Sequence, residues 1–177
     1  VEMLRRGVAK VENSGLSGLV TLSKGDAQDL SAYTPLDASG AASGEAGSLQ
    51  AGSIDKVSMS FGVRNVPDRA KALREMRRVL SKRPSSRVCI LEFSLPSGDR
   101  LLSRLARGFI TYGVPLIGKI TTFGRGGDEY KYLEESITKF PSPQQFAALM
   151  TREGLPVHNI TEFAYGAVQL YHAGVEG

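Results

Sequence analysis

The chain has 177 residues, of which 41% are hydrophobic and 23% charged, so it is long and apolar enough to form one domain with its own core. Its net charge of +4 permits an acidic partner, a nucleic acid or an anionic membrane surface, but requires none of them. The single cysteine, Cys89, excludes an internal disulfide and a zinc cluster, and its apolar surroundings predict a buried thiol. No apolar run approaches the roughly 20 residues that span a bilayer.

The N-terminal third contains one clear element and one change of composition. Helical spacing predicts a helix over residues 2–13, because apolar residues recur on one face: Met3, Leu4, Val8 and Val11. A short strand is expected at residues 19–22, with Gly25-Asp26-Ala27 following at its tip. Glycine, alanine and serine dominate residues 31–53, so we expect a mobile insertion there, which the domain can lose.

The central stretch, residues 55–66, is typical of a strand that turns through a loop into a helix. Val57 and Met59 alternate with serines, and the strand breaks at Phe61-Gly62. Such a strand tip is where an open α/β sheet presents ligand-binding residues. Arg64 and Asn65 on this turn are therefore candidate site residues. The alternative is a polar turn whose Arg64 side chain points into solvent.

A helix over residues 67–82 follows, with Pro67 at its first position and Asp68 favouring its positive end. Its arginines and lysine indicate a solvated face rather than a nucleic-acid patch, because no aromatic residues lie between them. The apolar run 87–93 predicts a buried parallel strand, in which Glu92 must be either paired or near the site.

The segment 101–125 is apolar and aromatic, and all its charges are basic. This combination is compatible with contact to a lipid surface and equally with a helical cover over the sheet. Further on, Ser142 is the expected N-cap of a helix over 143–153. Residues 157–165 and 167–172 predict an antiparallel hairpin, with His158 and His172 at its surface or edge.

The segment Ser60-Phe-Gly-Val-Arg-Asn-Val66 resembles the signature loop of the ubiquinone/menaquinone biosynthesis C-methyltransferases. Further similarities follow in the same order along the chain, and together they are specific to that family. The matching segments are 72–73 with 78–80, Leu91-Glu-Phe-Ser94 with Pro96, Tyr112, Pro115-Leu-Ile-Gly118, Tyr130-Lys-Tyr-Leu133, Glu135-Ser-Ile137, Phe140-Pro141, and Met150 with Gly154.

This resemblance implies an α/β fold of the class I, Rossmann-like type, which binds S-adenosylmethionine and methylates a polyprenylated benzoquinol in ubiquinone biosynthesis. It places the cofactor against Asp26, Ala27 and Ser60, and gives Arg64 and Asn65 catalytic roles. No metal is implied. Four aromatic residues are the implied substrate contacts: Phe109, Tyr112, Tyr130 and Tyr132.

The glycine-rich loop and the ribose-binding acid of the family have no counterpart in the chain. It therefore resembles the C-terminal two-thirds of the domain, a single partial methyltransferase domain over 1–177 without its first strands. Alternatives are a non-catalytic fragment or partner subunit and a demethylmenaquinol methyltransferase. The resemblance also implies peripheral contact with a membrane, and a ubiquinone-biosynthesis complex or a homodimer as the assembly, but no nucleic-acid partner. The implied location is the matrix face of the mitochondrial inner membrane, or the cytoplasm in a bacterium.

Overall fold

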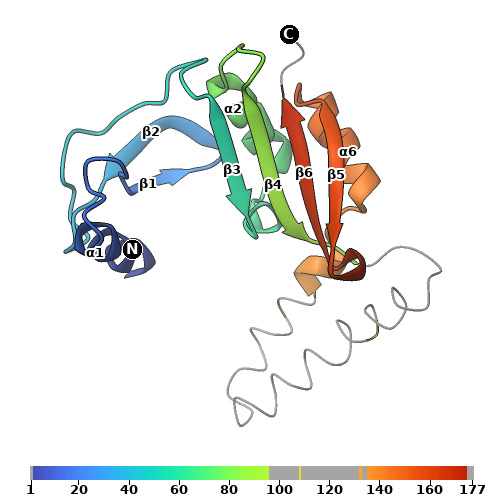
Figure 1. The fold of residues 1–177 in the computed structure, drawn as a ribbon, viewed down its shortest axis with the longest axis horizontal. Helices are drawn as coiled ribbons and strands as arrows, with labels where there is room; N and C mark the ends of the chain where they lie inside the picture. Colours follow the sequence, from blue (N-terminus) through green and yellow to red (C-terminus); the bar gives the residue numbers. More distant parts are fainter. Residues whose placement is uncertain (1, 96–107, 109–131, 133–134, 175–177) are drawn as a thin grey trace.

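The structure is a computed structural model that describes residues 2–95, 108, 132 and 135–174. Four strands form its central sheet: β3 (Lys56–Ser60), β4 (Arg87–Phe93), β5 (Val157–Phe163) and β6 (Val168–Gly174). Their order in the sheet is β3-β4-β6-β5 (Figure 1). β3 and β4 are parallel, whereas β6 runs antiparallel to both β4 and β5. The predicted α/β sheet with a C-terminal antiparallel hairpin is therefore confirmed.

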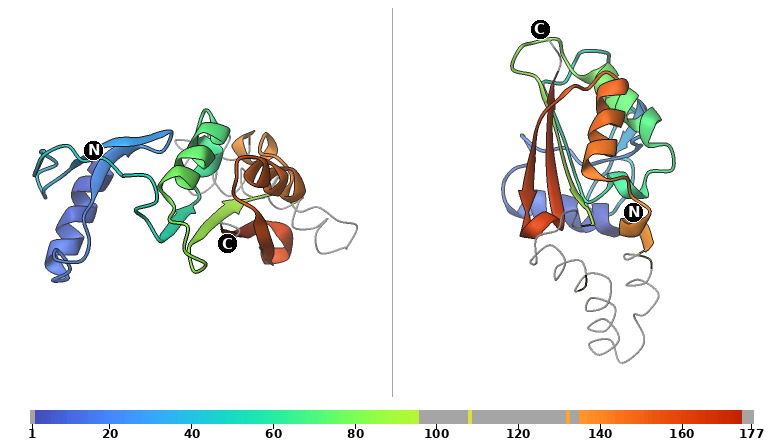
Figure 2. Two further views of the ribbon diagram at one scale, coloured as in Figure 1. Left: turned by 90° about the horizontal axis from the view of Figure 1, so that it is seen from above. Right: turned by 90° about the vertical axis from the view of Figure 1, so that its right-hand side faces the viewer.

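Two helices, α2 (Arg69–Val79) and α6 (Pro143–Arg152), cover one face of this sheet (Figure 2). Phe146 of α6 is fully buried, and its ring lies 5.0 Å from those of both Phe140 and Tyr171. The apolar face of α2 meets the same core through buried residues at helical spacing, Leu73, Met76 and Val79. The buried cluster comprises Val63, Leu73, Met76, Leu80, Val88, Ile90, Phe140, Phe146, Met150, Leu155, Tyr171 and Ala173.

The helix starts differ in how well the sequence predicted them. Ser142 caps α6 as expected, in a reciprocal capping box with Gln145. In α2 the N-cap is Asp68, whose carboxylate accepts a hydrogen bond from the backbone N–H of Lys71 at 2.9 Å. Pro67 therefore precedes the cap, and its expected place in the first helical turn was wrong. An acidic side chain satisfies a free N–H group there, which proline cannot do.

The second sheet face is less covered. Side chains of β3, β4 and β6 line a cavity of about 390 Å³ on this face, and Cys89 among them is half-buried rather than buried. The Cys89 Sγ atom lies 3.8 Å from Nδ1 of His172. β6 pairs with β4 on one side and with β5 on the other, so it is an inner strand. The edge position expected for His172 was therefore wrong.

The hairpin turn is also longer than predicted. β5 ends at Phe163, and a 3-10 turn, η3 (Ala164–Gly166), leads into β6. Ala164 and Tyr165 both have left-handed backbone conformations, with φ values of 48° and 56°. Residues in that region cannot continue a strand, so the expected strand end at Tyr165 was wrong.

The N-terminal region lies beyond the β3 edge of the sheet (Figure 1). The helix α1 (Glu2–Asn13) has the predicted bounds, but the strand expected at 19–22 does not form there. Instead β1 (Ser23–Asp26) pairs antiparallel with β2 (Asp29–Pro35). The pairing partner decides the position of this strand, because the residues of β2 lie opposite 23–26 and not opposite 19–22.

The predicted mobile insertion 31–53 therefore begins inside a strand, since β2 extends to Pro35. Tyr33 forms an antiparallel bridge with Gly47, and Leu36 forms one with Ala42. Whether the domain tolerates its loss remains a prediction. In the described part of the chain, no helix is long and apolar enough to cross a membrane, and no cluster of three potential metal ligands occurs.

Candidate active site

The candidate site begins where β3 ends. Phe61 follows the strand with a φ of 55°, a strained conformation for a bulky residue, and its backbone N–H donates to the Leu91 carbonyl at 2.8 Å. Val63 is fully buried and anchors the short 3-10 turn η1 (Val63–Asn65) against the core. The ring of Phe61 lies 4.6 Å from that of Phe93 on β4. These contacts give the loop one defined course out of the sheet.

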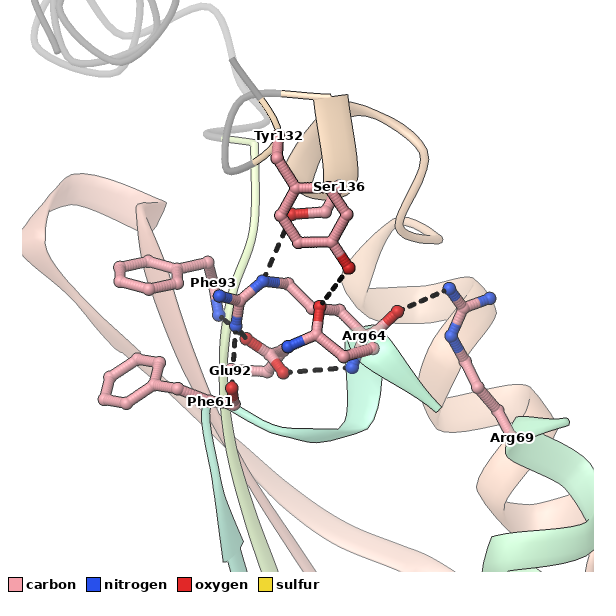
Figure 3. A network of polar contacts seen from close by, with 8 residues as sticks. Phe61, Arg64, Arg69, Glu92, Phe93, Tyr132 and Ser136 are labelled. Atoms are coloured by element: carbon pink, nitrogen blue, oxygen red, sulfur yellow. Dashed lines mark hydrogen bonds and ion pairs between the residues drawn. The ribbon is translucent and has the colours of Figure 1, made fainter. Parts of the chain in front are cut away.

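Arg64 points inward from this loop (Figure 3). Its side chain is 9% exposed, so the alternative of a solvent-directed arginine is wrong. The Nη1 atom donates to Glu92 Oε1 at 2.6 Å and to the Phe61 carbonyl at 2.9 Å, and Nε donates to Ser136 Oγ at 3.3 Å. The guanidinium carbon also lies 5.2 Å from the centre of the Phe93 ring. The ion pair, the hydrogen bonds and the face of the Phe93 ring thus hold the Arg64 side chain in one rotamer.

Glu92 is the buried partner of this arginine. Its side chain is fully buried at the penultimate residue of β4, where a carboxylate without a partner would be very costly. Besides the ion pair, Oε2 accepts from the Arg64 backbone N–H at 3.1 Å, and Oε1 accepts from the Phe93 N–H at 2.8 Å. The expectation that Glu92 is either paired or near the site is confirmed.

Tyr171 lies behind this pair in the core. Burial raises the pKa of its phenol, and the negative charge of Glu92 raises it further. Its hydroxyl is buried and has no hydrogen-bond partner among the residues that the structure describes. Tyr171 therefore stays neutral at every physiological pH, and Arg64 is the charged partner of Glu92.

Three further residues join the site from outside the sheet. The Tyr132 hydroxyl donates to Asn65 Oδ1 at 3.1 Å, although the Tyr132 side chain is 59% exposed. Ser136 reaches Arg64 from the short helical stretch that follows. From α2, Arg69 Nη2 donates to the Arg64 carbonyl at 3.0 Å (Figure 3). The structure thus places Tyr132 beside Asn65 and Arg64, and the roles expected of these three residues stay predictions.

Sequence reasoning missed Ser136 and Phe93 as parts of the site. Both lie within segments that resemble the family, Glu135-Ser-Ile137 and Leu91-Glu-Phe-Ser94, so the signal was present. Three of the expected substrate contacts, Phe109, Tyr112 and Tyr130, lie outside the described residues, as does the segment 101–125.

The expected cofactor residues lie apart from one another. Asp26 and Ala27 form the β1–β2 turn, beside Leu30 and Tyr33, and line a cavity of about 520 Å³. Ser60 instead lines the cavity on the second face of the sheet. Ala27 also borders a cavity of about 330 Å³ next to β3, where Ser58 rather than Ser60 is exposed to it. The described residues therefore do not unite Asp26 and Ser60 in one cavity.

The Asp26 carboxylate is held by its neighbour. The backbone N–H of Gln28 donates to Asp26 Oδ1 at 2.8 Å, and this bond, with that of the Gln28 side chain, keeps the pKa of Asp26 below its ordinary value. The Gln28 side-chain oxygen in turn accepts from the backbone N–H of Asp68 at 3.0 Å. Gln28 thus ties the β1–β2 turn to the start of α2, a few residues beyond Asn65.

Comparison with solved structures defines the class to which this fold belongs. A SAM-dependent methyltransferase from Aquifex aeolicus matches 97% of the chain and 63% of its own length, with a TM-score of 0.56 and 16% identity. A possible exported protein from Bordetella parapertussis matches 99% of the chain and 51% of its own length, with a TM-score of 0.65 and 15% identity. The mixed sheet ending in an antiparallel hairpin is therefore the class I methyltransferase fold.

Sequence comparison then identifies the family. The profile of the ubiE/COQ5 methyltransferase family matches residues 1–176, and the chain belongs to that family. The Ubiquinone/menaquinone biosynthesis C-methyltransferase UbiE of Geobacter sulfurreducens is 39% identical over 119 residues, which are 67% of the chain and 44% of that protein. Its namesake in Pseudomonas aeruginosa is 32% identical over 98% of the chain and 59% of that protein. The chain thus spans about half the length of these relatives.

Proposed function

We propose that the protein transfers a methyl group from S-adenosylmethionine to a ring carbon of a polyprenylated benzoquinol in ubiquinone biosynthesis. The observation that carries this proposal is the inward-held guanidinium of Arg64 at the carboxyl end of β3, the end at which an open α/β sheet binds its ligands. Membership of the ubiE/COQ5 family supports the choice of reaction.

The acceptor carbon must become nucleophilic before it can take a methyl group. Loss of a quinol O–H proton does this, because the resulting oxyanion pushes electron density onto the ring. Arg64 cannot be the base, since a guanidinium stays protonated. It can donate hydrogen bonds to the developing oxyanion and polarise a water that takes the proton, while Asn65 orients that water or a quinol oxygen. After transfer the ring carbon loses its own proton and the ring regains its aromaticity.

S-adenosylmethionine supplies the electrophilic methyl group of its sulfonium. The residues of the β1–β2 turn fit its adenine ring: the Asp26 carboxylate keeps acceptor capacity beyond its bonds to Gln28, and Ala27 leaves space beside it. Tyr132 is the described aromatic residue that reaches Asn65 and can contact the quinol ring.

The test compares methylation by the full-length wild type with that by Arg64→Ala. We expect turnover to fall about 100-fold or more, the scale of losing one transition-state donor, with the S-adenosylmethionine affinity almost unchanged. Arg83→Ala is the control, because Arg83 forms an exposed ion pair with Asp55 far from the loop. Lost cofactor binding with intact turnover at saturation would contradict the assigned role.

Two alternatives are separated by the same assays. One is a non-catalytic fragment or partner subunit, for which titration of S-adenosylmethionine would show no binding. The names of the UbiE relatives also include menaquinone biosynthesis, so a demethylnaphthoquinol should be tested beside the benzoquinol. Preferential methylation of the naphthoquinol would replace the proposed substrate.

The proposal extends to location. A long isoprenoid tail prefers lipid, so we propose that the segment 101–125 contacts the membrane surface, in mitochondria at the matrix side of the inner membrane and in a bacterium from the cytoplasm. Its apolar and purely basic composition supports this. Replacing Arg104 and Arg107 by Glu should weaken binding to anionic liposomes and spare activity on a tail-less quinol. Unchanged liposome binding would contradict the contact. A homodimer and a ubiquinone-biosynthesis complex remain further proposed assemblies.

A further inference from the structure

We infer that Glu92 is a positioning residue, which aims the guanidinium of Arg64 so that its Nη2 atom faces the acceptor. This inference rests on the proposed methyl transfer and adds to it a residue that does not touch the substrate. Its starting point is that Glu92 binds Arg64 at two places, through Oε1 to Nη1 and through Oε2 to the backbone N–H.

These two bonds fix both ends of the arginine. The backbone bond holds the η1 turn against β4, and the ion pair sets the plane in which the guanidinium lies. Glu92 belongs to β4 and itself accepts a hydrogen bond from the Phe93 N–H. The carboxylate that holds Arg64 is therefore part of the sheet rather than of the loop. A site built on a strand is held more accurately than one built on a loop.

The remaining contacts determine which nitrogen is available. Nη1 is shared between Glu92 and the Phe61 carbonyl, and Nε is bound to Ser136. Nη2 has no hydrogen-bond acceptor among the residues that the structure describes. By binding Nη1, Glu92 leaves Nη2 as the donor that faces the substrate. Its negative charge also balances that of Arg64, so the oxyanion is recognised by directed N–H groups rather than by an excess of positive charge.

A positioning role and a purely structural role for Glu92 predict different effects of the substitution Arg64→Lys. Arg64→Lys keeps the charge and an ion pair with Glu92, but an ammonium cannot bind Glu92 with one nitrogen and the substrate with another. We expect its turnover to fall nearly as far as that of Arg64→Ala. A structural pair would be rescued largely by Lys.

The first test is a double-mutant cycle in the full-length enzyme. Glu92→Gln should lower kcat about 10- to 100-fold, the cost of a small misplacement of a catalytic group, while KM for S-adenosylmethionine changes less than about twofold. In an Arg64→Ala background the same substitution should have less than about twofold effect, because its effect acts through Arg64. Additive effects in the cycle would overturn the inference.

Two controls separate positioning from loss of stability. Glu153→Gln makes the same chemical change in another arginine pair, that with Arg74, and should leave kcat unaltered. Leu155→Ala removes a fully buried side chain and lowers stability without touching the site. If it lowers kcat at saturation as much as Glu92→Gln does, the effect of Glu92 is one of stability and the inference fails.

The second test needs no activity and keeps the inference separate from the proposed function. In wild-type protein with 15N-labelled arginine, slow rotation should give separate Nη1 and Nη2 resonances for Arg64, and in Glu92→Gln or Glu92→Asp these should move together or merge. If both quinols go unmethylated by the wild type while these spectra behave as expected, the proposed function fails and the positioning stands. Merged signals in the wild type, or separate ones in Glu92→Gln, would overturn the positioning.

Discussion

The four-stranded sheet and the N-terminal region hold their candidate site residues in different ways. Arg64 is held by a fully buried carboxylate, a strand-end carbonyl and a ring, above a core that includes Phe146 and Tyr171. Among the described residues up to position 53, by contrast, two hydrophobic side chains are buried, Val8 and Leu36.

The N-terminal region is joined to the sheet by a few polar tethers. The Leu30 N–H donates to Glu75 of α2 at 2.8 Å, and the Gln28 side chain accepts from the Asp68 N–H. The arginine loop is thus preorganised by packing, whereas the Asp26–Ala27 turn is positioned by hydrogen bonds that a change of pH or salt can break. The two regions should therefore respond differently to the same disturbance.

The largest effect is expected from the core under the arginine loop. Phe146→Ala removes a fully buried ring that contacts two others, and should lower the free energy of unfolding by about 3–5 kcal/mol. Val8→Ala is the corresponding change in α1. It should cost about 1 kcal/mol, because it removes a smaller side chain from a region with fewer buried residues. Urea unfolding of both variants gives the two values. Equal losses would show that the N-terminal helix shares the core of the sheet.

The next effect is an acid-induced release of the N-terminal region. The hydrogen bond from Arg78, with a smaller one from the Leu30 N–H, lowers the pKa of Glu75 from its ordinary 4.5. A carboxyl whose pKa is lower in the folded state stabilises at pH values above 4.5, and this stabilisation is lost as the pH falls through the lowered value. The β2–α2 tether should therefore open in acid while the sheet remains paired.

Hydrogen exchange measures this release. The Leu30 amide should lose protection as the pH falls below about 4.5, whereas the Ile90 amide in β4 should keep it. Glu75→Gln is the control, since its Leu30 amide should be less protected at neutral pH and insensitive to acid over that range. Simultaneous loss at both amides would mean that the two regions unfold as one unit.

A smaller effect is expected from the contact of Tyr132 with Asn65. Tyr132→Phe removes one exposed hydrogen bond, so KM for the quinol should rise about two- to fivefold and kcat should stay close to that of the wild type. Tyr165→Phe is the matched control, because Tyr165 is equally exposed but lies in the β5–β6 turn. A large fall in kcat would place Tyr132 among the catalytic residues.

The smallest effect is expected from shortening the segment after β2. Deleting 38–45 removes the turn after Leu36 together with its bridge partner Ala42, and keeps β2 and the bond from Arg78 to the Leu49 carbonyl. Because loop length changes stability only logarithmically, the melting temperature should stay within a few degrees. Extending the deletion through 31–35 should cost more, since it removes most of β2. A large loss from the short deletion would show that this turn is packed.

The sequence predicted those parts of the fold in which local pattern and tertiary packing agree. The bounds of α1 and β4, the cap of α6 and the apolar face of α2 all follow from periodicity or capping chemistry. The misplaced strand at 19–22 has a different cause. Its true position depends on pairing with β2, most of whose residues were assigned to the mobile insertion from their composition.

In the candidate site, sequence reasoning found the residues but not their connections. Arg64 and Asn65 could be identified from the strand-to-helix turn, and the need of Glu92 for a partner from its place in an apolar strand. That each is the partner of the other could not be predicted, because parallel pairing of β3 and β4 brings them together across the sheet. The same holds for Ser136, which no local pattern connects with Arg64.

The contacts of Arg64 also impose an order on folding. The β5–β6 hairpin joins chain neighbours and closes at little entropic cost, whereas Arg64 reaches Glu92 across 28 residues and Ser136 across 72. Glu92 cannot contact Arg64 until β3 has paired with β4. Ser136 cannot contact Arg64 until the chain that follows β4 has returned to the sheet. A partly folded chain can thus contain the hairpin and both helices while its arginine is still unplaced. The candidate site is then among the last parts to assemble, and its completion reports complete folding rather than the presence of secondary structure.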